Sequence, residues 1–122
     1  MKPQAELLII DSIHSKCIAM IAAREDELPA GADIPSLSHQ MATTYESGIQ
    51  ALAYNDGDVN LAAADLSDLP TQLHHLGAPM EVILEGIKAK FTLEVEAFAF
   101  YFANKEMEQT ELIKNIKSIL KK

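Results

Sequence analysis

The sequence of 122 residues has one cysteine, no tryptophan, few glycines and no long apolar run. The single cysteine, Cys17, cannot form an intramolecular disulfide, so we expect a reducing compartment and predict a cytoplasmic protein. The apolar run 7–10 stops at Asp11 with no cleavage site behind it, which argues against a signal peptide. The apolar stretch 97–103 is far shorter than the roughly 20 residues of a membrane span, so we predict no membrane partner.

Basic residues are missing between Arg24 and Lys88, although that interval carries many acidic residues. Over the whole chain 18 acidic residues outnumber 10 basic ones, giving a net charge of −8. A nucleic-acid-binding protein needs a basic stripe, and a few lysines near the C-terminus do not make one. Lysines in a last helical turn also stabilise the helix dipole without any partner. The sequence therefore predicts no nucleic-acid partner.

Sequence motifs for cofactors and covalent catalysis are absent as well. The five glycines are scattered, so there is no glycine-rich phosphate loop, and no Gly-x-Ser-x-Gly turn is present. Asp11 and His14 have a spacing seen in di-iron bundles, but those proteins repeat the pair on a second helix and this chain does not. We predict no cofactor and no metal, and no catalytic constellation beyond the pair described below.

Apolar residues recur at spacings of three and four along most of the chain, which is typical of amphipathic helices. The spacing predicts helices over about 3–26, 36–54, 59–76 with a kink or restart at Pro70, 79–103 and 110–120. Short connections favour antiparallel neighbours. We therefore predict that residues 1–122 form a single all-helical domain, a compact and largely antiparallel four- to five-helix bundle. Its central element is the long helix at about 79–103.

The predicted long helix has a second, narrower apolar stripe that includes Val82, Leu93 and Phe100. Small residues on the same stripe, such as Gly86 and Ala97, would let another backbone approach closely. Because a helix with two apolar stripes is either central to a bundle or shared with a second chain, we predict a homodimer through these residues.

Two ionisable side chains interrupt apolar helix faces. His14 lies between Ile10 and Cys17 on its stripe, and Glu94 lies within the main stripe of the long helix. A carboxylate is rarely buried without a partner, so we predict that Glu94 is at least partly buried and that His14 is its leading candidate partner. The pair could act in acid–base chemistry, or it could be a structural hydrogen bond.

The favoured functional hypothesis is a small helical protein-binding module without catalytic activity, with an acidic face for a basic partner. That face is predicted from five acidic residues, Glu46, Asp56, Asp58, Asp65 and Asp68. Such a field speeds the encounter with a basic protein, although acids also serve solubility and helix capping. Two alternatives stay open: a small enzyme or ligand-binding bundle that uses His14 and Glu94, and an acidic neutraliser of the immunity or antitoxin type.

Overall fold

The computed structural model describes residues 2–122, and all regular structure in that range is helical. The α-helices are α1 Gln4–Ala22, α2 Ile34–Tyr54, α3 Val59–Ser67, α4 Met80–Lys90, α5 Thr92–Ala103 and α6 Gln109–Leu120, and the 3-10 turns are η1 Glu25–Glu27 and η2 Gln72–His75. The all-helical class is thus confirmed, with six α-helices where four or five were predicted. Within this range no helix has both the length and the apolar content needed to cross a bilayer.

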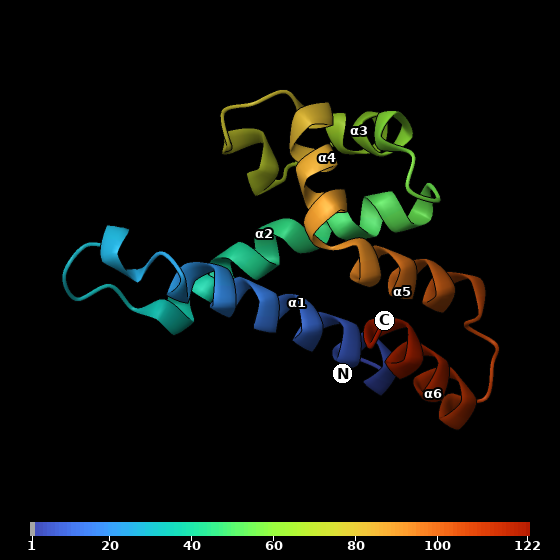
Figure 1. Cartoon of the computed structure of the whole chain (residues 1–122). Coiled ribbons are helices and arrows are strands. Elements are labelled where there is room, and N and C mark those ends of the chain that lie inside the picture. Colours follow the sequence, from blue (N-terminus) through green and yellow to red (C-terminus); the bar gives the residue numbers. More distant parts are fainter. Residues whose placement is uncertain (1) are drawn as a thin grey trace.

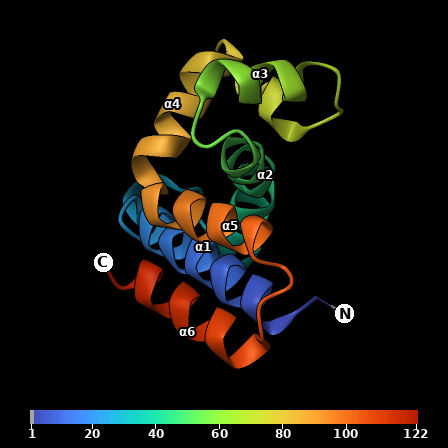
Figure 2. The same ribbon diagram turned by 90° about the vertical axis from the view of Figure 1, so that its right-hand side faces the viewer.

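The central helix of the fold is α2, which contacts α1, α3, α4 and α5. On one side of α2, helices α1 and α5 pack beside each other and α6 covers both (Figures 1 and 2). On the other side, α3 and α4 pack against α2 and against each other (Figure 2). The prediction that residues 79–103 form the central helix is therefore wrong.

A glycine on α2 explains how closely α4 approaches it. Gly48 is buried, and a Cβ atom at this position would lie 2.8 Å from Ile87 Cδ1 and 3.2 Å from Leu84 Cδ2. Helix α4 therefore packs directly on the bare backbone of α2. A glycine inside a helix lowers the stability of that helix, but here it allows the close approach of a neighbour.

The predicted long helix is in fact two helices, α4 and α5, which are separated at Phe91. This residue has φ −117° and ψ 36°, outside the helical range, and its side chain is fully buried. The Thr92 hydroxyl donates to the carbonyl of Lys88 at 2.8 Å, the acceptor that the Thr92 N–H would use in an unbroken helix. The break adds the sixth helix and directs α4 toward α3 and α5 toward α1 (Figure 1).

The helix predicted over 59–76 is interrupted near Pro70, where a kink or a restart was expected, and only a short 3-10 turn follows. Helix α3 ends at Ser67, and Thr71 begins η2 by accepting a hydrogen bond from the Leu73 N–H at 3.3 Å. His74 Nε2 lies 3.0 Å from each of the carbonyl oxygens of Leu66 and Leu69, so it carries the proton and donates to both. The histidine thus satisfies backbone acceptors where α3 ends, which is a structural role.

Candidate functional site

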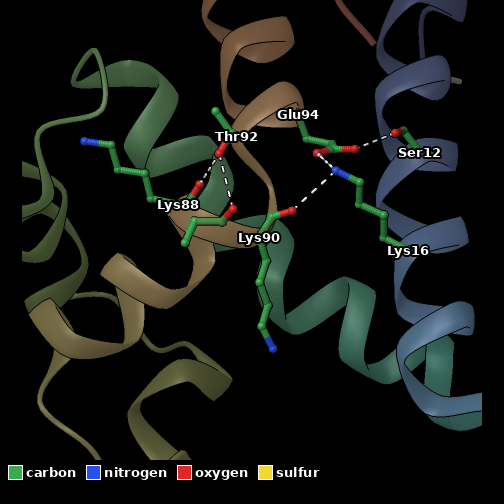
Figure 3. A network of polar contacts seen from close by, with 7 residues as sticks. Ser12, Lys16, Lys88, Lys90, Thr92 and Glu94 are labelled. Atoms are coloured by element: carbon green, nitrogen blue, oxygen red, sulfur yellow. Dashed lines mark hydrogen bonds and ion pairs between the residues drawn. The ribbon is translucent and has the colours of Figure 1, made fainter. Parts of the chain in front are cut away.

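Glu94 is fully buried near the start of α5, and α1 supplies its partners. Ser12 Oγ donates to Glu94 Oε2 at 2.5 Å, and Lys16 Nζ donates to Oε1 at 2.8 Å (Figure 3). Lys16 Nζ also donates to the carbonyl of Lys90 at 3.3 Å. These four residues, Ser12, Lys16, Lys90 and Glu94, are called the Glu94 network below. The predicted burial of Glu94 is confirmed.

The break at Phe91 creates the geometry of this network. In an unbroken helix the Lys90 carbonyl would accept from the Glu94 N–H, whereas here it accepts from Lys16. The Lys16 ammonium therefore lies at the negative, C-terminal end of α4, while the Glu94 carboxylate lies in the positive first turn of α5. Both helix dipoles favour these charges. The network joins α1 to the two helices that the break separates (Figure 3).

His14 is not a partner of Glu94, and the predicted pair is therefore wrong. Among residues 2–122, no hydrogen bond or ion pair links the two side chains, and both Glu94 oxygens are held by Ser12 and Lys16. The imidazole of His14 instead lies against that of His39, with ring centroids 5.3 Å apart. The pair fails because His14 and Ser12 occupy different sides of α1, and only the side with Ser12 and Lys16 meets Glu94.

The chemistry available to the Glu94 network is limited, because its polar atoms already have partners within the protein. Cys17, a free cysteine on α1, is fully buried, and burial together with the charge of Glu94 raises the pKa of its thiol from 9.0 to about 11. A thiol with that pKa is protonated at neutral pH and unreactive. In the described part of the chain, no group of three or more His, Cys, Asp or Glu side chains could hold a metal ion. The arrangement supports helix packing rather than catalysis.

Two of the five predicted acidic residues have structural partners around α3. Asp58 precedes α3 and accepts a hydrogen bond from the Leu61 N–H at 3.1 Å, which makes it the helix cap. Asp65, on α3, accepts from Asn55 Nδ2 at 2.9 Å and remains exposed. Asp56 has a positive φ of 52° in the turn between α2 and α3, a conformation that aspartate tolerates.

The other two predicted acidic residues lie on α2 and at the end of α3. Glu46, which is partly buried, accepts from Gln50 Nε2 at 3.0 Å and forms an ion pair with the exposed Lys2, whose Nζ lies 3.7 Å away. Asp68 is exposed immediately after α3. Helices α2 and α3 pack side by side, as the prediction of a shared acidic region requires.

A groove with apolar residues lies between α2 and α3. It is lined by Ser47, Gln50, Ala51, Tyr54, Asp65, Leu66 and Leu69. Tyr54 and Leu69 are 63% and 54% exposed, so two large apolar side chains border the groove without being covered by the rest of the protein. The sequence pattern places Leu69 within the predicted helix 59–76 and Tyr54 at the end of the predicted helix 36–54. It misses the groove, because periodicity alone does not show which apolar residues stay uncovered.

The residues of the predicted dimer stripe do not share one helix. Val82 lies on α4 and is 60% exposed, whereas Leu93 and Phe100 lie on α5 and are partly covered. Ala97, one of the small residues of the stripe, is fully buried within the protein. The prediction of one continuous apolar stripe on the surface is therefore wrong, because the break at Phe91 divides the helix that would carry it.

No family model, curated protein or solved structure matches this chain. Its function must therefore be argued from its own side chains. Among the candidate sites, the Glu94 network is internally satisfied, while the α2–α3 groove combines exposed apolar side chains with an exposed carboxylate.

Proposed function

We propose that the protein is a protein-binding module whose α2–α3 groove takes a basic amphipathic helix from a partner. The observation that carries this proposal is the exposed pair Tyr54 and Leu69 beside Asp65 in one groove. Both walls of the groove come from the segment 25–87, which contains no lysine or arginine. An amphipathic helix that lays its apolar face into a groove is a common mode of peptide recognition.

The apolar part of the groove supplies a reason to bind. Tyr54 and Leu69 leave apolar surface in contact with water, and covering such surface contributes about 25 cal/mol for each Å². Aromatic residues are enriched among the residues that dominate protein interfaces. Tyr54 also stacks on Phe102, with ring centroids 4.1 Å apart, so its ring is already held in place for a partner.

The charge of the groove selects the kind of partner. Asp65 lies in the groove itself, whereas Glu46, which is hydrogen-bonded to Gln50 of the lining, is already 3.7 Å from Lys2 Nζ. A partner helix with lysines or arginines beside its apolar stripe places positive charge next to Asp65. Electrostatic attraction of this kind raises the association rate and weakens as salt screens it. An acidic neutraliser would use the same face against a folded basic protein.

A synthetic peptide tests this proposal without knowledge of the natural partner. The probe is a helical peptide with leucine on one face and lysine along both edges, and a scrambled peptide of the same composition serves as its control. We expect titration calorimetry to give tighter binding of the helical peptide than of the scrambled one, with an affinity that falls as salt rises. Asp65→Asn and Leu69→Gln should each weaken binding about tenfold or more, since each removes an interface contact.

Matched variants outside the groove complete the experiment. Asp26→Asn removes an exposed acid from η1, and Ile18→Gln removes an apolar side chain that is 47% exposed on α1. Both should leave the affinity unchanged. If these controls weaken binding as much as the groove variants do, attraction to the overall charge explains the result and the groove is not the site. Equal binding of the helical and scrambled peptides contradicts the proposal as well.

A further inference from the structure

A second cleft lies on the opposite side of α2 from the groove. It has a volume of about 550 Å³, and its lining includes Met20, Leu28, Met41, Tyr45 and Lys90. Tyr45 of this cleft and Tyr54 of the groove are nine residues apart, which at 100° a residue places them on opposite faces of the helix. The cleft is therefore independent of the proposed peptide site.

Lys90 gives this cleft an uncompensated positive charge. Arg24 and Glu27 also line the cleft, and they pair with each other at 2.6 Å. Lys90 Nζ forms no ion pair with any residue in the range 2–122, so its charge is the one left for a ligand. The Lys90 side chain extends away from Glu94 and Lys16 (Figure 3). The backbone carbonyl of Lys90 accepts a hydrogen bond from Lys16, so the Glu94 network holds the backbone of Lys90 in place.

The rest of the lining suits a flexible apolar chain. The methionines Met20 and Met41 are only partly covered by the protein, and methionine side chains adapt to the shape of the group that contacts them. Burial raises the pKa of Tyr45, so its hydroxyl remains protonated and able to donate a hydrogen bond. A mostly apolar cleft of several hundred Å³ with a few placed polar groups is typical of small-molecule sites.

We propose that this cleft binds a medium-chain fatty acid, with the carboxylate at Lys90 and the hydrocarbon chain along Met20 and Met41. Charge complementarity selects an anionic headgroup, because Lys90 has no acidic partner within the described chain. A smaller cleft of about 260 Å³ shares Tyr45 and Lys90 but leads toward Val82 instead. The larger cleft has more room for the chain, so the chain enters between the methionines.

Dodecanoate below its micelle concentration is the probe for a calorimetric titration of the full chain. We expect saturable binding with one site for each protein, and no binding of acetate, which has the headgroup without the chain. Dodecyltrimethylammonium, which has the same chain with a positive headgroup, should bind much more weakly. Lys90→Gln should weaken dodecanoate binding about tenfold, since it removes a charge-assisted contact.

Matched variants locate the hydrocarbon chain. Lys114→Gln removes an exposed lysine on α6 and should leave the affinity unchanged. Met41→Gln should weaken binding, whereas Val82→Gln in the smaller cleft should not. If Met41→Gln lowers the melting temperature, Met20→Gln tests the same wall. The groove variant Leu69→Gln should not change the affinity for dodecanoate. Failure of the fatty-acid proposal can therefore be distinguished from failure of the proposed peptide site.

Three results would overturn the inference. One is the lack of saturable dodecanoate binding to the wild-type protein. Another is equal affinity for the cationic amphiphile, because Lys90 would then select nothing. The third is a loss of affinity on Val82→Gln without any loss on Met41→Gln, which would place the chain in the smaller cleft.

Discussion

The Glu94 network and the α2–α3 groove both place a carboxylate among apolar side chains. The carboxylate is buried and paired in the network, whereas in the groove it is exposed. Glu94 is fully buried, and both of its oxygens have partners on α1. Asp65 is exposed, has one amide partner, and lies in the groove with the uncovered Tyr54 and Leu69. Because a buried charge needs partners inside the protein, the Glu94 network indicates a structural role. The groove leaves both its charge and its apolar surface open to a partner.

The largest effect is expected from removing the cation of the Glu94 network. Lys16→Met should lower the free energy of unfolding by about 3 kcal/mol, because it leaves a buried carboxylate without its ion pair. Ser12 keeps its hydrogen bond, and Lys16 itself is 38% exposed, so the loss should fall at the lower end of the usual range. Urea unfolding followed by circular dichroism measures it.

A double-mutant cycle separates this pair from general packing effects. Adding Glu94→Leu to Lys16→Met should recover most of the lost stability, since the unpaired buried charge is then gone. Lys114→Met on the exposed face of α6 is the matched control and should change stability little. Additive losses in the cycle would show that the two charges do not interact.

The helical class and most helix boundaries could be predicted from the sequence, because an apolar spacing of three and four depends only on the local chain. The break at Phe91 could not be predicted, since the stripe from Ile87 through Phe91 to Val95 continues across it without a change of period. The break depends on contacts made by the folded protein, including the Lys90 carbonyl with Lys16.

Glu94 could be predicted as a buried anomaly, but its partner could not. Periodicity shows which residues share a face of one helix and says nothing of which face meets another helix. One feature of the sequence does point to the actual partners of Glu94: Ser12 and Lys16 are four residues apart and so lie on one face of α1. His14 was preferred only because its own stripe was apolar.

The next largest effect concerns two glycines on facing helices. Gly48→Ala should lower stability by about 1 kcal/mol, because the new methyl group meets Ile87 and Leu84 and this outweighs the gain in helix propensity. Gly86→Ala, where an added Cβ meets nothing within 4 Å, should raise stability by about 0.5–1 kcal/mol. Thermal unfolding of both variants measures the difference. Equal changes would show that α4 does not pack on the α2 backbone as described.

A smaller effect on stability is expected from the titration of Cys17, because the pKa of its thiol depends on the charge of Glu94. Its raised pKa means that the folded state holds the thiol proton more tightly than the unfolded state. The stability this provides is complete below pH 9.0 and is lost as the pH rises toward about 11. Glu94→Gln should lower the pKa of the thiol, but not to its ordinary value, because burial is the larger cause. The carbon chemical shift of Cys17 Cβ against pH, followed by NMR in the folded protein, measures the shift, and an unchanged profile would contradict it.

The smallest effect on stability is expected in the groove, where the largest effect on binding is proposed. Leu69 is 54% exposed, so Leu69→Gln removes few internal contacts and should change the free energy of unfolding by no more than about 0.5 kcal/mol. The same substitution should weaken binding of the leucine–lysine helix, since it removes apolar surface that the peptide would cover. This separation of stability from binding is what an open site predicts and an internal contact does not. If Leu69→Gln instead costs as much stability as Lys16→Met, Leu69 belongs to the core and the contrast between the two regions fails.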